Sequence, residues 1–128
     1  MRGLKQTPAM QKAYGFALEV VDLAAELDEK RAYVMSKQIL RCGTSIGANI
    51  AEAQGGISTA DLSAKMAIAY KEALETKYWL NLLFDKQYIS EEKFELLFAK
   101  LDEICRIVFT VLKKTRYTHL DKRAEQVE

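Results

Sequence analysis

The scarcity of proline constrains this chain more than any other feature. Pro8 is the single proline, and none follows it through residue 128. Proline and glycine are the strongest markers of turns, and the chain has only six glycines. So few turn-forming residues cannot supply the many short connections of a β-sandwich or β-barrel. The chain is therefore expected to consist of a few long segments joined by short turns.

Four segments repeat apolar residues three to four positions apart, which is the spacing of an amphipathic α-helix. Thr7 and Pro8 indicate the first helix start, because a capping hydroxyl and then proline suit a first turn. Ser58 and Ser90 are expected to cap the third and fourth helices. The sequence predicts an all-α, antiparallel up-down-up-down four-helix bundle with helices at residues 8–28, 31–54, 59–87 and 91–116.

The apolar stripe of each helix predicts which face is buried in the core. In the first helix the expected stripe is Tyr14, Leu18, Val21 and Ala25. In the second helix it is Met35, Ile39, Cys42, Ile46, Ile50 and Ala53. The third and fourth helices have similar stripes, from Leu62 to Phe84 and from Phe94 to Leu112. Residues 1–116 are thus expected to form one domain, followed by a basic, flexible tail at residues 117–128.

Composition narrows the cellular context. The chain is 49% apolar and 29% charged with a net charge of +1, which is ordinary for a globular protein. No apolar run is long enough for a membrane span or a signal peptide. Cys42 and Cys105 have no CxxC spacing and lie on apolar stripes, which indicates buried thiols in a reducing compartment. We expect a cytoplasmic protein without a membrane partner.

The second helix contains an unusual run of small residues, GTSIGANIAEAQGG at positions 43–56. Glycine in a helix interior costs about 1 kcal/mol relative to alanine, so Gly43 and Gly47 need a reason. A second, polar stripe lies beside the core stripe on the helical wheel and consists of Gln38, Arg41, Ser45, Asn49 and Glu52. The remaining face is small and nearly uncharged, where an exposed helix usually carries lysine and glutamate. It consists of Leu40, Thr44, Gly47, Ala48 and Ala51.

The third helix also has a second stripe beside its core face: Ile68, Glu72, Glu75, Trp79 and Leu82. One interpretation is that another subunit covers helices two and three, with Arg41 paired to Glu72 or Glu75 and Ser45 and Asn49 completing the hydrogen bonds. The alternative is that the polar stripe is solvated and Trp79 flanks the core of the monomer. The predicted oligomer interface is Gln38, Arg41, Ser45, Asn49, Glu52, Glu72, Glu75 and Trp79.

Two segments, QILRCGTSIGANIAEAQ and KMAIAYKEALETKYWLNLL, resemble a known bacterial family. Its founding members are four-helix-bundle proteins encoded by intervening sequences within 23S rRNA genes. The family pattern of Arg, then Ser-Ile-x-Ala-Asn-Ile-Ala-Glu, falls on Arg41 and residues 45–52, and its acidic positions in helix three fall on Glu72 and Glu75. Many members have proline at the position of Gly47 and glycine at that of Ala53.

The resemblance implies a four-helix bundle that assembles as a homopentamer and has no established enzymatic activity. The chain is also similar to the accessory proteins of diversity-generating retroelements, which bind nucleic acid through a basic surface of their pentamer. The pentamer is an implication of the resemblance alone, because the helical wheel indicates only an assembly of some kind.

The residue patterns of common catalytic sites are missing from this sequence. His119 is the only histidine, whereas di-iron bundles need Glu-x-x-His pairs on two helices. Glu72 and Glu75 without histidines are more typical of ion pairs than of metal ligands. Ser45 has no neighbouring histidine, and Cys42 lies on the core stripe without a base, so neither is expected to act as a nucleophile. We predict no enzymatic activity, no metal site and no cofactor.

Charge is distributed unevenly along the predicted bundle. The start of helix one, the turn between helices two and three and the end of helix four share one end. The basic residues expected at that end are Arg2, Lys5, Lys12, Lys113, Lys114, Arg116, Lys122 and Arg123. The acidic residues expected at the other end are Asp22, Glu26, Asp28, Glu29, Glu91, Glu92 and Glu95. A symmetric ring would repeat the basic end, which favours low-specificity binding of RNA or DNA through phosphates.

Other interpretations of the same charges stay open. Lysines near a helix C-terminus complement the helix dipole, and a charged tail keeps a protein soluble. The chain would then be a protein-interaction or scaffold protein with no nucleic-acid role. A third class is a binder of small molecules in the central channel of a pentamer. Salt dependence separates the first two, because phosphate contacts weaken steeply as salt rises.

Overall fold

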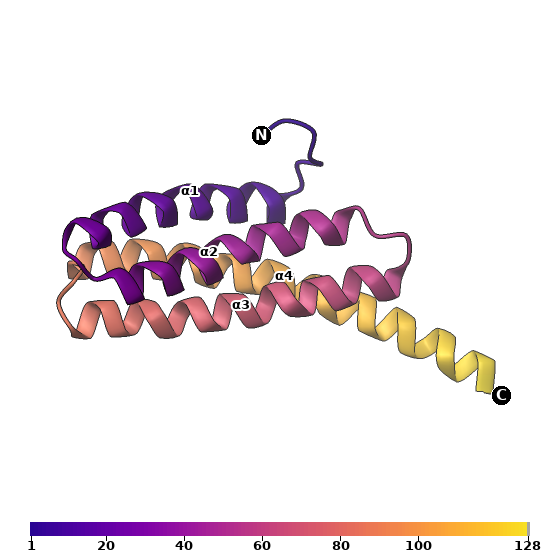
Figure 1. Cartoon of the computed structure of the whole chain (residues 1–128). Helices are drawn as coiled ribbons and strands as arrows, with labels where there is room; N and C mark the ends of the chain where they lie inside the picture. The colour runs from indigo at the N-terminus through magenta and orange to yellow at the C-terminus, as the bar shows by residue number, and fades with distance from the viewer. Residues whose placement is uncertain (128) are drawn as a thin grey trace.

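The structure, a computed structural model, describes the backbone of residues 1–127 and the side chains of residues 1–115. Its helices are α1 (Pro8–Glu29), α2 (Tyr33–Gln54), α3 (Thr59–Asp85) and α4 (Glu91–Val127). They run alternately in opposite directions, each against the next, and α1 also packs against α4 (Figure 1). The predicted four-helix bundle is confirmed. We call the end where α1 begins and α2 connects to α3 the open end, and the opposite end the closed end.

The predicted helix starts are confirmed in their geometry. The hydroxyls of Thr7, Ser58 and Ser90 each accept a hydrogen bond from the backbone N–H three residues further on, at 3.1–3.2 Å. These bonds satisfy donors that a helix start otherwise leaves without a partner. Thr7 also donates to the side chain of Gln54 at the end of α2, so one residue both caps α1 and ties it to α2.

Both connections at the closed end use the same backbone device. Arg31 and Gln87 have a φ of 63°, a left-handed conformation that glycine usually adopts at a helix end. In each case the next residue donates its N–H to a carbonyl five residues earlier, at 2.9 Å. As a result α2 begins at Tyr33 and α3 ends at Asp85, whereas the sequence predicted residues 31 and 87. Sequence reasoning missed these turns because neither contains glycine.

The bounds of α4 also differ from the prediction. The helix is assigned as Glu91–Val127, whereas the expected end was residue 116. No proline or glycine occurs after residue 56, so no residue of that kind ends the helix. The predicted flexibility of the tail, and the side chains of Arg116, Lys122 and Arg123, lie outside the described residues.

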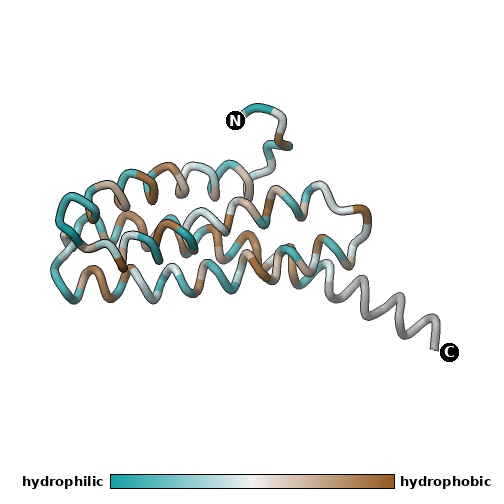
Figure 2. Tube along the Cα trace, in the orientation of Figure 1, coloured by the Kyte–Doolittle hydropathy of each residue, from teal (hydrophilic) through white to brown (hydrophobic). Residues whose placement is uncertain are grey.

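The core faces of α2, α3 and α4 agree with the predicted stripes, with side chains such as Ile46, Leu80 and Leu101 fully buried. In Figure 2 every helix carries both apolar and polar residues, as expected for an amphipathic bundle. The prediction for α1 was wrong. Its buried face is Ala9, Met10, Ala13, Phe16, Val20, Leu23, Ala24 and Leu27.

The stripe that was expected to be buried in α1 lies on the surface instead. Tyr14, Leu18 and Val21 are 40%, 53% and 50% exposed. The error has a simple cause: α1 has two apolar stripes with helical spacing, and spacing alone does not say which one faces the other helices. The stripe with Phe16, Leu23 and Leu27 carries more apolar volume and therefore gains more from burial.

The two interior glycines of α2 allow α1 to approach closely. A Cβ on Gly43 would lie 2.8 Å from a methyl group of Val20, whose side chain is fully buried. A Cβ on Gly47 would lie 3.6 Å from the Cβ of Ala13, an ordinary contact distance. Gly47 is itself buried against α1, so it does not belong to the exposed face to which the sequence assigned it. The close helix contact thus explains at least Gly43 within a single chain.

We expect Gly43→Ala to destabilise the bundle and Gly15→Ala to stabilise it. The alanine at residue 43 would press against the stiff β-branched Val20, and such overpacking costs about 1–3 kcal/mol. The alanine at residue 15 would meet nothing within 4 Å and would gain the helix propensity of about 1 kcal/mol. Urea unfolding followed by circular dichroism would measure both. Equal midpoints for the two variants would contradict the close contact.

Candidate functional site

The polar stripe expected at an interface forms a connected network between α2 and α3 of one chain. The guanidinium of Arg41 lies 3.5 Å from the carboxylate of Glu72, pairs with Glu75, and donates to the side chain of Gln38 at 2.9 Å. The hydrogen bond to Glu75 raises the pKa of Arg41 above its ordinary value. The indole N–H of Trp79 donates to the same Glu75 carboxylate at 3.1 Å. These five residues therefore act as one hydrogen-bonded group.

The other polar residues of the stripe also have hydrogen-bond or ion-pair partners within the chain. Asn49 donates its side-chain amide to the hydroxyl and to the carbonyl of Ser45, at 3.0 and 2.8 Å. Glu52 pairs with Lys65 of α3 at 2.7 Å. Lys65 was not singled out in the sequence, because its meeting with Glu52 depends on how α2 and α3 are aligned. The interface role of the stripe stays a prediction, since every polar member described has a partner within the chain.

These ion pairs contribute little to the stability of the single chain. The side chain of Arg41 is 51% exposed, and exposed ion pairs are worth about 0–1 kcal/mol each. Trp79 is partly buried and packs against the core of its own chain, so its apolar surface does not by itself require another subunit. The network therefore determines which polar groups the α2–α3 side presents at the surface, and it adds little to the stability of the bundle.

An apolar surface lies beside the α1–α2 contact. We call it the apolar face: Tyr14, Leu18 and Val21 of α1 with Leu40, Thr44 and Ala48 of α2. On a helical wheel these positions flank the positions that bury Val20 and Gly43 against each other. Leu40 is 38% exposed, so half-exposed aliphatic side chains come from both helices. None of the six residues is charged, which is unusual for a solvated helix surface.

The open end gathers several of the predicted basic residues. Arg2, Lys5, Lys113 and Lys114 are exposed, and the topology brings the segments that carry them to the same end (Figure 1). The predicted acidic residues at the other end, which include Glu29 of α1, are likewise exposed. Exposed cations such as Lys37 and Lys86 also lie near that end, so each end carries a surplus of one sign of charge and not charges of one sign alone.

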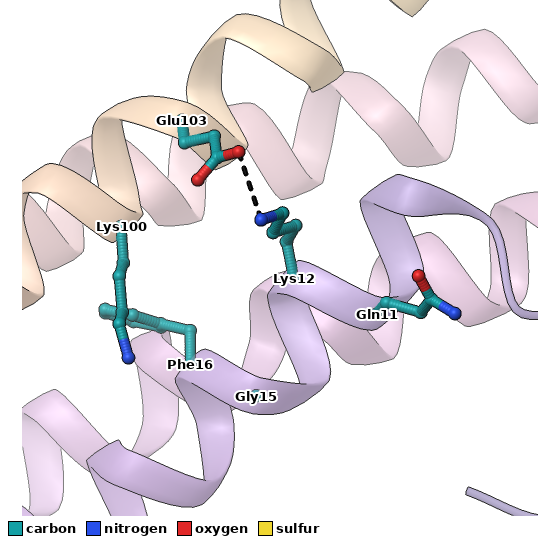
Figure 3. A pocket seen from close by; sticks show the side chains of 6 residues that line it. All are labelled: Gln11, Lys12, Gly15, Phe16, Lys100 and Glu103. Atoms are coloured by element: carbon teal, nitrogen blue, oxygen red, sulfur yellow. Dashed lines mark ion pairs between the residues drawn. The ribbon is translucent and has the colours of Figure 1, made fainter.

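Lys12, another of the predicted basic residues, forms an ion pair with a neighbouring helix. Its ammonium group lies 3.1 Å from the carboxylate of Glu103 on α4. Figure 3 shows Lys12 pointing toward Glu103 across the groove between α1 and α4. A neighbouring pair, Lys100 with Glu19 at 2.8 Å, joins the same two helices. Lys12 thus carries a partly neutralised charge, which sequence position alone did not indicate.

The open end also contains a hollow of about 490 Å³. Its polar rim includes Lys5, whose backbone carbonyl accepts a hydrogen bond of 2.8 Å from the side chain of Gln54. Its walls are the apolar side chains of Leu62, Met66, Ile107 and Val111. No sequence motif indicates this hollow, because its lining comes from the N-terminal segment and all four helices.

The described residues show neither a metal-binding cluster nor an activated cysteine thiol. Within residues 1–115 no group of three or more histidine, cysteine, aspartate or glutamate side chains is placed to hold a metal ion. Burial raises the pKa of the Cys42 and Cys105 thiols, which disfavours the reactive thiolate. None of the helices searched in the described part of the chain is both long and apolar enough to cross a membrane.

Comparison with known proteins places this fold in a family. Residues 5–110 match the family described as 23S rRNA-intervening sequence protein. A crystal structure of a protein of unknown function from the S23 ribosomal protein family of Bacteroides thetaiotaomicron has a TM-score of 0.80 and 45% sequence identity. The match covers 82% of this chain and 98% of that one. No curated protein matches this chain. Neither description names an enzymatic activity. Because the family match spans most of the sequence, the chain belongs to the 23S rRNA-intervening sequence protein family.

Proposed function

We propose that this chain is a non-enzymatic, self-assembling helical bundle that binds RNA or DNA with low sequence specificity through its open end. The observation that carries the proposal is the uneven charge along the bundle, with a surplus of cations at the open end and of carboxylates at the closed end. A molecule with a net charge of +1 attracts a polyanion only if its cations are gathered on one surface.

The chemistry of the open end favours phosphate contacts. Arg2, Lys5 and Lys113 are exposed and have no ion-pair partner among residues 1–115. Such cations can release counterions from a nucleic acid on contact, which gives affinity that depends on salt and little on sequence. No base-reading motif accompanies them, so contacts with the sugar-phosphate backbone carry the binding. Arg116, Lys122 and Arg123, whose side chains lie outside the described residues, are proposed to add further phosphate contacts.

Self-assembly would repeat this basic end. A closed ring requires two different surfaces, one on each side of the subunit, because its contacts are head-to-tail. The chain offers two: the uncharged apolar face on α1 and α2, and the polar stripe on α2 and α3. In a head-to-tail contact the apolar face would meet the α2–α3 side of the next copy, where the exposed Ile68 and the partly buried Trp79 lie beside the polar stripe. The family resemblance makes a pentamer the expected ring.

A second candidate function is supported by the apolar face alone. A scaffold protein would use this surface to hold a different protein, and its binding would tolerate salt because it buries apolar area. We favour the nucleic-acid function because it also accounts for the cations at the open end.

Lysine footprinting tests where nucleic acid binds. The folded protein would be acetylated with and without an excess of duplex DNA, and each lysine would be quantified by mass spectrometry. We expect bound DNA to protect Lys5 and Lys113 from acetylation and to leave the labelling of Lys37 and Lys86, near the closed end, unchanged. These four lysines are all exposed in the single chain, so they form a matched set. Equal protection at both ends, or none at either, would contradict the proposal.

A further inference from the structure

Two aromatic rings meet at the surface where α3 packs against α4. The rings of Tyr70 and Phe109 have centroids 5.8 Å apart and planes inclined by 41°. Phe109 is 49% exposed, while Tyr70 is half-buried between the helices. The ring of Phe109 therefore packs against Tyr70 and is still accessible to a ligand.

A hollow lies on each side of this ring pair along the helices. The hollow toward the open end has a volume of about 230 Å³ and is lined by Lys71 and Lys113 besides the two rings. The hollow toward the closed end has a volume of about 320 Å³ and is lined by Lys77 and Arg106 besides the same rings. Flat molecules could therefore approach the rings from two sides.

The charges around the rings are positive. The carboxylate in the second hollow, Asp102, is already paired with Lys77 at 2.5 Å. Lys71, Arg106 and Lys113 have no ion-pair partner among residues 1–115. Arg106 and Lys113 are seven residues apart on α4, which is about 10 Å along the helix, with Phe109 between them. A strand running along α4 would meet a cation before the ring and another after it.

We propose that Tyr70 and Phe109 form a stacking site for unpaired bases of a single-stranded nucleic acid, with Lys71, Arg106 and Lys113 holding the flanking phosphates. This inference rests on the proposed function and names single-stranded segments as the preferred ligand. Every base has a flat face, so stacking is tolerant of sequence. The bases of a duplex are already stacked on one another, so a duplex can contact only the cations.

The test compares three labelled ligands of equal length by fluorescence anisotropy: oligothymidylate, the same strand without bases, and duplex DNA. Wild-type protein should bind oligothymidylate more tightly than the abasic strand. Phe109→Ala should weaken oligothymidylate binding about tenfold, the loss typical of one base–aromatic stack, and leave the abasic strand and the duplex unchanged. Phe109→Tyr should retain binding because it keeps the ring.

A matched control is Leu96→Ala, because Leu96 is on the same helix and is 48% exposed but lies near the closed end. It should leave all three affinities unchanged. If the wild type binds all three ligands alike and Phe109→Ala has no effect, the proposed function stands and the stacking site is overturned. If the wild type binds none of them even at low salt, both proposals fail.

Discussion

Replacing Arg2, Lys5 and Lys113 with glutamine is expected to weaken nucleic-acid binding and to flatten its dependence on salt. Each lost phosphate contact lowers the slope of log K against log salt by about 0.9, so the triple variant should lose about 3 units of slope. Anisotropy titrations of duplex DNA over a series of salt concentrations would give both slopes. The change should be largest at low salt, where counterion release contributes most to binding.

The control for this variant makes the same charge change at the other end of the bundle. Lys37, Lys86 and Lys93 lie near the closed end, and their replacement by glutamine should leave the salt slope of the wild type in place. Unfolding midpoints of both triple variants should stay near that of the wild type, since neither set is buried. A control that loses as much affinity as the test variant would contradict a localised binding surface.

Introducing charge into the apolar face is the second change with a large expected effect. In the double variant Leu18→Glu with Leu40→Glu, assembly should be lost, because unpaired charges buried in an interface cost several kcal/mol. Light scattering after size-exclusion chromatography should then report a mass of 14.5 kDa. Helicity should be retained, because Leu18 and Leu40 are 53% and 38% exposed in the single chain.

Two comparisons make the assembly prediction specific. Leu96→Glu, at a position on α4 that is 48% exposed, should leave the mass of the assembly unchanged. Asn49→Leu and Glu72→Ala test the polar stripe, and each should lower the mass more than it lowers helicity. If both stripe variants and the Leu18–Leu40 variant keep the wild-type mass, neither proposed surface takes part in the assembly.

Much of the fold was predictable because it depends on local chemistry. The hydroxyls of Thr7, Ser58 and Ser90 each cap a helix by accepting from the N–H three residues later, and such a local relation can be read from the sequence. Helices α2, α3 and α4 each have one dominant apolar stripe, so the spacing of their apolar residues predicts which face is buried. Four long helices with short connections leave few arrangements other than the bundle that the structure shows.

Other features depend on how the helices align, which spacing does not determine. In α1 two apolar stripes compete, and the one with Tyr14 and Leu18 was wrongly assigned to the core. The pairing of Lys12 with Glu103 joins residues that are far apart in sequence, so the partial neutralisation of Lys12 was not foreseen.

The ring pair on α3 and α4 was missed for the same reason. Tyr70 and Phe109 were not among the predicted site residues, because their meeting depends on the register between α3 and α4. Among the predicted basic residues, Lys113 was correctly placed at the open end, but only the structure shows that it also lines a hollow beside these rings.

The most direct test of the central claim is a salt titration of the wild-type protein with labelled structured RNA and duplex DNA, followed by anisotropy. We predict binding to both at low salt and a steep loss of affinity toward physiological salt, as phosphate contacts require. Absence of binding at low salt, or binding that does not change with salt, would contradict the claim that the open end binds nucleic acid.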